Sequence, residues 1–466
     1  MGGLLAARAL ARSFDVTLVE RDALDAEPGA RKGIPQARHA HILLARGREV
    51  IETLFPGIGD ELRARGAVPV AIGSTVGYLT PFGWSPPFSP GVELVGCSRD
   101  LLEAATRARV RAHPAIEVLD ETDALGLVGD RRRIRGVRIS ARSGSGTSGA
   151  ERTLEADLVV DATGRGSPLP RWLDGLGVKV PADTVVDAKA VYASAIIETP
   201  VLPCGWNVLF VLAAPPGVLR GGALFPIEGG KSLMTLIGMG GEVPPTSETE
   251  WRAYVRTPRS QLLDDVLAKV KLVSPIIGSR STSNRFRPYH RGTLPDGLVA
   301  IADSVTAFNP IYGQGMTIAA LQAVALAEEA DRGTGLERRA RARIARIGQE
   351  GFRMAVGADR RVPGVTGKLP IAERAFNRYL DALFSVCPES PSATRSLTRV
   401  MHMLEPAARL FSPANFRLAL PQALRGVPPE RSPELSAAWR AIDASITQAS
   451  TVSARATHPR PLTNDG

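Results

Sequence analysis

The sequence predicts an α/β protein in which a Rossmann-like dinucleotide-binding domain is joined to an antiparallel-sheet domain and a helical C-terminal region. Three observations lead to this prediction. The chain opens on a helix and a strand typical of a βαβ unit, changes to period-two patterning near residue 189, and becomes helical and arginine-rich beyond residue 335. The predicted boundaries are residues 1–185 and 275–335 for the dinucleotide-binding domain, 186–274 for the antiparallel-sheet domain, and 336–449 for the helical region. Residues 450–466 are expected to form a disordered tail.

The opening segment, MGGLLAARALARSFDVTLVERD, has apolar residues at helical spacing from Leu4 to Leu10, followed by a strand pattern that ends at Glu20. A complete βαβ unit would place one strand and the first two glycines of G-x-G-x-x-G before Met1. Gly3 would then be the third glycine, which lets the helix pack closely on the sheet. We therefore expect the first strand to be missing, through a start codon assigned too far downstream rather than through degeneration of the protein. The other interpretation of this segment is an ordinary helix and strand that bind no nucleotide.

The antiparallel-sheet domain is predicted from four strand-like segments: VYASAIIE, WNVLFVLAA, GGALFPIE and KSLMTLIGM. The last two are joined by a Gly229-Gly230 turn. Two helices, ETEWRAYVRT and QLLDDVLAKVK, and a strand within RSTSNRFRPY are expected to follow. The change of period marks a second domain.

Composition excludes several classes of protein. The chain has 466 residues and is 44% hydrophobic, yet no apolar stretch reaches the roughly 20 residues that a transmembrane helix needs. Cys97, Cys204 and Cys387 lie far apart, which argues against a disulfide framework or a cysteine metal site and fits a reducing cytoplasm. The net charge of +10 comes from scattered arginines without an aromatic platform, so no nucleic-acid partner is expected. The basic helices after residue 335 could lie on a membrane surface, although packing in a core is favoured.

Three segments together point to a nucleotide cofactor. Glu20 ends the second strand of the opening unit, where its carboxylate can accept hydrogen bonds from ribose hydroxyls. In ADLVVDATGRGSP, a buried strand ends at Asp161 and turns through Gly164. In LVAIADSVTAFNPIYGQGMTIAALQ, a buried strand ends at Asp303, and a Pro-Gly loop precedes a helix that starts near Met316. The free N–H groups of that helix can stabilise negative charge on a flat ligand such as a reduced flavin.

These segments, in this order and at these separations, resemble the flavoprotein monooxygenase family with the para-hydroxybenzoate hydroxylase fold. RKGIPQARHAHILLARG, DLVVDATGRGSP and FNPIYGQGM are similar to its bacterial subgroup that contains polyether polyene epoxidases, and the similarity extends to about residue 440. The resemblance implies FAD as the cofactor, with NADPH or NADH as electron donor, used directly or through a separate reductase. It implies these cofactor-binding residues: Gly3, Glu20, Arg21, Arg31, Gly33, Ile34, Arg99, Asp161, Gly164, Asp303, Pro310, Gly313, Gln314, Gly315 and Met316.

The resemblance also assigns roles. Glu20 would bind the adenosine ribose, and Arg31 the FAD phosphates or ribose. Gly33 and Ile34 would lie beside the isoalloxazine, and Arg99 would also reach the FAD. Asp161 and Gly164 match a motif that touches FAD and the nicotinamide donor, whereas Asp303 and Pro310 to Met316 match the motif at the ribityl chain and flavin ring. One departure is Ala302, where the family usually has glycine.

The family's chemistry is transfer of oxygen from a flavin C4a-hydroperoxide to an electron-rich substrate, and we expect epoxidation of an alkene in a lipophilic polyketide or polyene of secondary metabolism. This chemistry needs O2 but no metal, and the sequence contains no catalytic triad, metal-spaced histidines or paired acids. His39 and His41 lie near the presumed flavin loop, where a structural role is favoured over a catalytic one. The predicted substrate lining is Tyr192, Trp206, Phe210, Phe225 and Met234.

Alternative functions remain open. An aromatic hydroxylase would use the same cofactor, and a prenyl-chain reductase would consume no O2. A flavin halogenase usually carries a W-x-W-x-I-P stretch, which this sequence lacks. A degenerate flavoprotein that binds a lipid or a partner without catalysis is the alternative of another class.

Overall fold

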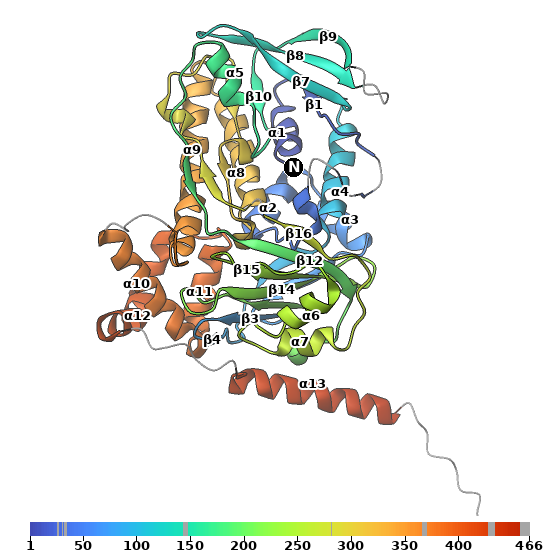
Figure 1. Cartoon of the computed structure of the whole chain (residues 1–466), viewed down its shortest axis with the longest axis vertical. Helices are drawn as coiled ribbons and strands as arrows, with labels where there is room; N and C mark the ends of the chain where they lie inside the picture. The colour runs from blue at the N-terminus through green and yellow to red at the C-terminus, as the bar shows by residue number, and fades with distance from the viewer. Residues whose placement is uncertain are drawn as a thin grey trace, which may run out of the picture.

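The computed structural model describes residues 1–25, 28–29, 31, 35–142, 148–280, 282–365, 371–426 and 434–456. Two lobes follow one another along the long axis (Figure 1). The upper lobe contains α1, α4, α5, α8 and α9 with several small sheets, and the lower lobe is built on a seven-stranded sheet. The predicted mixed α/β class is confirmed.

The upper lobe begins with the predicted helix and strand, which are confirmed as α1 (Gly2–Leu10) and β1 (Val16–Val19). β1 pairs in parallel with β6 (Ile116–Leu119), and β10 (Val159–Asp161) pairs in parallel with β18 (Leu298–Ala300). The remaining strands of this lobe form small antiparallel sheets: β7 (Thr122–Gly129), β8 (Ile134–Arg142) and β9 (Ser148–Glu155) in one, and β11 (Thr184–Val186), β17 (Asn284–Phe286) and β19 (Thr306–Ala307) in another.

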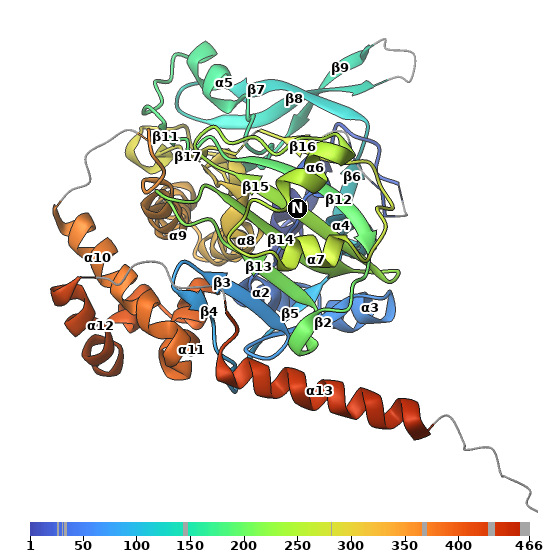
Figure 2. The same ribbon diagram turned by 60° about the horizontal axis from the view of Figure 1, so that its bottom comes forward.

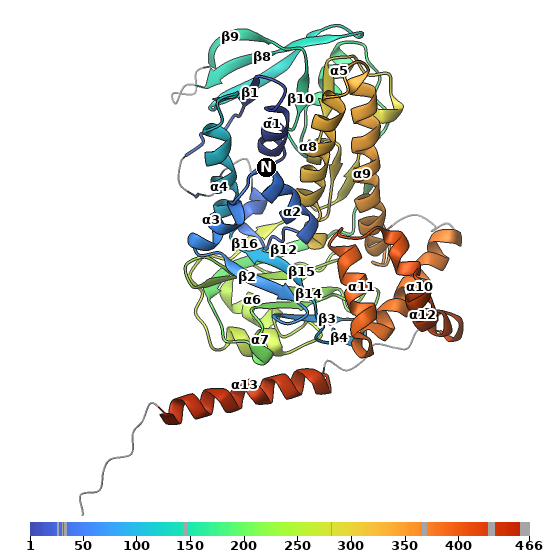
Figure 3. The same cartoon turned by 180° about the vertical axis from the view of Figure 1, so that it is seen from behind.

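The helices of the upper lobe share one apolar core. α8 (Gly315–Ala330) packs against α1 and lies beside α9 (Leu336–Asp359), as Figure 3 shows. Leu5, Ile318 and Leu326 are completely buried there. The other helices of this lobe and its border are α2 (Ala45–Leu54), α3 (Ile58–Ala64), α4 (Arg99–Arg111) and α5 (Leu169–Gly175).

The lower lobe contains the four strands predicted between Lys189 and Gly240: β12 (Val191–Glu198), β13 (Val208–Val211), β14 (Arg220–Ile227) and β15 (Lys231–Gly238). The sheet order is β16-β12-β15-β14-β13-β3-β4, and it includes strands from outside residues 186–274. These are β3 (Val76–Thr80), β4 (Gly83–Trp84) and β16 (Ile277–Ser279). β3 pairs in parallel with β13, whose backbone groups would otherwise form an edge. β2 (Val68–Ile72) and β5 (Val92–Gly96) form a separate hairpin-like pair nearby.

Helices cover one face of this sheet. α6 (Glu248–Tyr254) and α7 (Leu262–Leu267) lie across it in Figure 2. α13 (Ala437–Ala456) is attached to the same lobe at Trp439, which is 1% exposed, lies edge-on to Trp206 with ring centroids 5.0 Å apart, and donates from Nε1 to the Ser85 carbonyl over 2.7 Å. α13 includes the first residues of the predicted tail 450–466, and residues 457–466 lie outside the described part of the chain.

The described residues beyond residue 335 are mainly helical, as predicted. α10 (Ile371–Val386), α11 (Pro391–Met401) and α12 (Pro413–Arg425) form a small bundle beside the lower lobe with its own apolar core. Within the described residues, none of the helices is long and apolar enough to cross a membrane.

Ala302, the residue that departs from the family pattern, has a left-handed backbone conformation. Its φ is +54°, and its N–H donates to Gln322 Oε1 over 2.7 Å. A Cβ built on Gly2 would lie only 2.7 Å from the Ala302 Cβ, so the start of α1 packs directly on this turn. A non-glycine residue costs roughly 1–2 kcal/mol in this conformation.

We predict that Ala302→Gly raises the free energy of unfolding by about 1 kcal/mol because it removes this backbone cost, whereas Gly2→Ala lowers it by about 1–3 kcal/mol through overpacking. The free energy of unfolding of the double variant should be higher than the sum of the two single effects predicts, since the clashing Cβ of residue 302 is gone. Urea unfolding measures all three. Gly175→Ala is the control, because no atom lies within 4 Å of a Cβ at that helical position; strictly additive effects would contradict the contact.

Candidate active site

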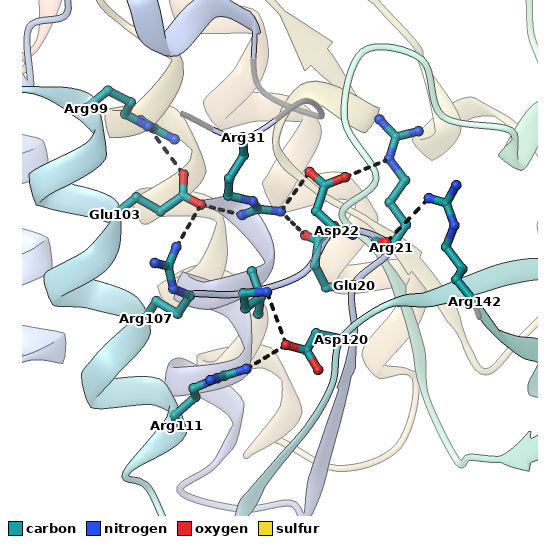
Figure 4. A network of polar contacts seen from close by, with 11 residues as sticks. Glu20, Arg21, Asp22, Arg31, Arg99, Glu103, Arg107, Arg111, Asp120 and Arg142 are labelled. Atoms are coloured by element: carbon teal, nitrogen blue, oxygen red, sulfur yellow. Dashed lines mark hydrogen bonds and ion pairs between the residues drawn. The ribbon is translucent and has the colours of Figure 1, made fainter. Parts of the chain in front are cut away.

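An ion-pair network holds the acidic end of β1 (Figure 4). Arg31 Nη2 lies 2.7 Å from Glu20 Oε2 and 3.3 Å from Asp22 Oδ2, while Arg31 Nη1 contacts the Glu103 carboxylate. Glu20 and Arg31, both predicted to bind the cofactor, are therefore brought together. The other oxygen, Glu20 Oε1, accepts from the Asp22 N–H over 3.1 Å.

Glu103 links this network to α4. It is 3% exposed, and Arg99 and Arg107 flank it one helical turn away, with nitrogen–oxygen distances of 3.7 and 3.8 Å. The Nε atoms of Arg31 and Arg99 are buried and have no hydrogen-bond partner. Arg21 is different, because its side chain is 61% exposed and lies 3.9 Å from Asp22 at the outer side of the network.

The DATGRG turn is fixed by the Asp161 carboxylate. Asp161 Oδ1 accepts from the Thr163 N–H over 2.9 Å and from Ser304 Oγ over 3.2 Å, and Oδ2 accepts from Ser167 Oγ over 2.6 Å. Gly164 has φ +89°, donates its N–H to Ser304 Oγ over 2.8 Å, and has no atom within 4 Å of a Cβ built on it. Asp161 thus positions the turn, and Gly164 lies on its open side.

Gly3 lies close to this turn. A Cβ on Gly3 would be 3.6 Å from the Ala162 Cβ, so α1 approaches the residues after β10 closely. Burial raises the pKa of Asp303, although the nearby Arg165 and Arg99 guanidinium groups act in the opposite direction. The three segments that contain Gly3, Asp161 and Asp303 therefore meet in space.

The Pro-Gly loop that contains residues 309–313 leads directly into α8. Pro310 begins a short 3-10 turn, and Gly313 has φ +65°, with Ile42 Cγ2 at 2.0 Å from where a Cβ would be. Only glycine fits there. α8 begins at Gly315 after Gln314, and no side chain caps it, so its first N–H groups remain available to a ligand. Met316 contacts the guanidinium of Arg99.

A buried hydrogen-bond network fixes this loop, and sequence reasoning did not find it. Tyr192 OH donates to Asn309 Oδ1 over 2.5 Å, and the Asn309 N–H donates to Asn284 Oδ1 over 2.8 Å. Asp359, the last residue of α9, accepts from Asn284 Nδ2 over 2.6 Å, from Tyr312 OH over 2.6 Å and from Asn309 Nδ2 over 3.2 Å. Asn309, directly before Pro310, was the one sequence signal for this network, because asparagine often caps turns. Nothing in the sequence around Asp359 indicates that its carboxylate binds this loop.

The predicted substrate residues divide between the two faces of the seven-stranded sheet. Phe210 and Phe225 face the upper lobe, with ring centroids 4.8 Å apart. Tyr192 lies on that face too, but its hydroxyl is bound to the loop at Asn309. Trp206 and Met234 lie in the core beneath α6, α7 and α13. They therefore do not face the side of the sheet on which Phe210 and Phe225 lie. Alternation along each strand causes the difference, because Met234 is directly opposite Leu224, whereas Phe225 is opposite Leu233.

Two adjoining cavities lie between the lobes. One is next to Arg99 and Met316 and reaches α2 and α3. The other lies on the sheet, where the described lining is largely apolar: Ile42, Val70, Ile72, Val76, Leu94, Val95, Val208, Phe210, Phe225 and Pro226, with His41, Gly96 and Cys97. His41, Val95 and Cys97 border both cavities. Burial raises the pKa of the Cys97 thiol far above its usual range.

The two histidines near this junction are both neutral at pH 7. Burial lowers the pKa of His39 to about 4, and burial together with Arg99 lowers that of His41 to about 3. His39 is 5% exposed, and its Nδ1 lies 2.8 Å from Ser194 Oγ. Gly33 and Ile34, which were predicted to flank the isoalloxazine, lie outside the described residues.

Protein Rv3254 of Mycobacterium tuberculosis (strain ATCC 25618 / H37Rv) is 32% identical to this chain over 337 residues, which cover 69% of each protein. The chain belongs to the same family as Protein Rv3254. No protein-family model matches the sequence.

Solved structures establish the fold of this Rv3254-related chain. The flavin-dependent brominase Bmp2 superposes with a TM-score of 0.64 at 15% identity, covering 91% of this chain and 96% of the other. PqsL of Pseudomonas aeruginosa, described as a probable FAD-dependent monooxygenase, gives 0.56 at 18% identity over 84% and 95%. The p-nitrophenol 4-monooxygenase PnpA of Pseudomonas putida DLL-E4 gives 0.58 at 15% identity over 86% and 95%. The fold is that of flavin-dependent monooxygenases and halogenases.

The described residues fit FAD as a ligand on structural grounds. The buried Nε–H group of Arg31 has no hydrogen-bond partner, the first turn of α8 has no side-chain cap, and Gly164 lies on an open side. A phosphate-bearing molecule with carbonyl acceptors would satisfy such donors.

The network around Asp359 predicts a pH dependence of stability. Burial raises the pKa of Asp359 to about 6, with the Tyr312 and Asn309 hydrogen bonds acting against this, while the unfolded carboxyl titrates near 3.9. The folded protein therefore loses stability as pH rises through this interval, because only the unfolded state gains an ionised carboxylate at first. We expect the difference in melting temperature, wild type minus Asp359→Asn, to become smaller as the pH rises from 4 to 7. Thermal melts at four pH values test this, and a constant difference would contradict it.

Proposed function

We propose that this protein is an FAD-dependent monooxygenase that oxygenates a lipophilic small molecule. The observation that carries the proposal is the junction of the two cavities, where His41, Val95 and Cys97 line both the cavity next to Arg99 and Met316 and the cavity on the apolar sheet surface. In a fold shared with flavin-dependent oxygenases, this arrangement supports a cofactor bound beside an apolar substrate.

The residues proposed to hold FAD come from both ends of the upper lobe. Glu20 and Arg31 would bind the adenosine ribose and phosphates, and Arg99 would donate from its guanidinium, which Glu103 holds in place. Gly164 and the N-terminus of α8, after Gly313, would approach the cofactor through backbone groups. When bound, FAD would supply the activation of O2 after reduction by NADPH or NADH, used directly or through a separate reductase.

The chain's own residues then have two tasks. Backbone N–H groups at the start of α8 stabilise negative charge on the ligand above them. The apolar wall of Val76, Val208, Phe210 and Phe225 excludes water from the place where oxygen is transferred. Oxygen transfer to an alkene requires no strong acid or base from the protein.

The apolar lining supports a lipophilic substrate, and we propose epoxidation of an alkene in a polyketide or polyene of secondary metabolism. Aromatic hydroxylation is the second candidate, because the one imidazole at the cavity junction could bind a ring hydroxyl. The three cysteines are free thiols, which supports a reducing cytoplasm as the site of action.

We predict that Arg99→Leu weakens FAD binding roughly 10- to 100-fold, because a charge-assisted hydrogen bond from the guanidinium is lost. Quenching of FAD fluorescence on titration with the full-length chain gives the dissociation constant. The dissociation constant of Arg99→Lys for FAD should lie between those of the wild type and Arg99→Leu, since lysine keeps the charge but not the planar donor.

Arg138→Leu is the matched control, because this arginine is half exposed and paired with Glu151 on the outer sheet. Equal affinities for all four proteins would show that Arg99 does not hold FAD. A folded protein that binds no FAD, either as this chain or with upstream in-frame residues added, would refute the proposed function, and NAD(P)H-dependent O2 uptake with polyene substrates would extend it.

A further inference from the structure

His41 lines both cavities at their junction, and one nitrogen of its ring has a defined hydrogen-bond partner. Its Nδ1 is 2.6 Å from the backbone carbonyl of His39. A carbonyl oxygen only accepts hydrogen bonds, so Nδ1 must carry the proton. In the neutral ring the proton on Nδ1 leaves Nε2 as an acceptor, and the structure thereby fixes the tautomer of His41.

The position of the ring is also fixed by its neighbours. The Ala40 N–H donates to Thr235 Oγ1 over 3.0 Å, and Thr235 Oγ1 lies 2.7 Å from Ser194 Oγ, which in turn lies 2.8 Å from His39 Nδ1. Residues 39 and 40 are therefore attached to β12 and β15 of the sheet. On the other side, Ile42 packs on Gly313 of the Pro-Gly loop. His41 is held between the sheet and the loop that precedes α8.

The His41 imidazole is a polar group in the otherwise largely apolar cavity that lies on the seven-stranded sheet, called the sheet-side cavity below. Among the described residues that line this cavity, His41 is the one whose side chain bears nitrogen or oxygen, and the remaining polar side chain is the protonated Cys97 thiol. The charged residues Arg48, Glu52 and Arg99 line the neighbouring cavity instead. A ligand on the sheet therefore meets an apolar wall and one acceptor.

We propose that His41 Nε2 accepts a hydrogen bond from the substrate, and that the substrate class is apolar molecules bearing one hydroxyl or N–H donor, such as an alcohol, enol, phenol or N-heterocycle. This inference rests on the proposed function, since it names the substrate of the same site. It adds a specificity-determining residue that the resemblance did not assign, at a position where a structural role was expected.

The test compares two probes of nearly the same shape, 2-naphthol and 2-methoxynaphthalene, of which only the first can donate. Calorimetric titration of the full-length chain, with and without FAD, gives both dissociation constants. We expect wild-type protein to bind 2-naphthol roughly 5- to 10-fold more tightly. In His41→Phe this ratio should fall to about 1, because the ring shape is kept and the acceptor is lost. His41→Gln should partly restore it through its amide oxygen.

A spectroscopic signature separates this role from a merely structural one. The imidazole 15N resonance of His41 Nε2 is expected to move upfield when 2-naphthol binds to the FAD-free wild-type chain, to stay in place when 2-methoxynaphthalene binds, and to be absent in His41→Phe. His113→Phe is the control, because His113 follows α4 and is not among the residues that line either cavity.

Each result decides for or against the proposal. A wild-type affinity ratio near 1, a ratio unchanged in His41→Phe, or no binding of either probe would overturn it. FAD titration of the same preparations reports on the proposed function separately, so loss of hydroxyl preference in a protein that binds FAD would refute only the role of His41.

Discussion

The hydrogen bonds that converge on Asp359 fix the loop before α8, and the side of the candidate site formed by the first turn of α8 depends on them. They join the end of α9, Asn284 of β17, and the loop from Asn309 to Tyr312, while Tyr192 extends the network to β12 of the lower lobe. Each of these groups is buried or nearly so, and a buried polar group without a partner is costly. The loop before α8 is therefore held in one conformation, and with it the first turn of α8.

The sheet of the lower lobe separates two environments. On one face, Trp206, Trp251 and Trp439 pack in a core with α6, α7 and α13. On the other, Phe210 and Phe225 border a cavity that His41 and Ile42 also line. Strand alternation alone produces this division, because adjacent residues of each strand point to opposite faces. One sheet thus contributes both to a structural core and to the proposed substrate surface.

Local patterns in the sequence predicted much of this arrangement. The helix from Leu4 and the four strands between Lys189 and Gly240 follow from periodicity, and the start of α8 was predicted within one residue from the Pro-Gly loop before it. Periodicity cannot give register, so it could not separate Phe225 from Met234. Nor could it show that Asp359 meets Asn284 and Asn309, or that β3 pairs with β13, because these contacts join residues far apart in the chain. The roles of Gly33 and Ile34 remain predictions.

The pairing of β3 with β13 has a consequence for biosynthesis. Val76 lies opposite Val208, so one strand leaves the ribosome more than a hundred residues before its partner. Until β13 is made, β3 exposes apolar side chains and unpaired amides, which is the condition under which edge strands join wrong neighbours. Translation speed between these two segments, and chaperones that bind the waiting strand, would then influence the yield of native protein as strongly as the final stability does.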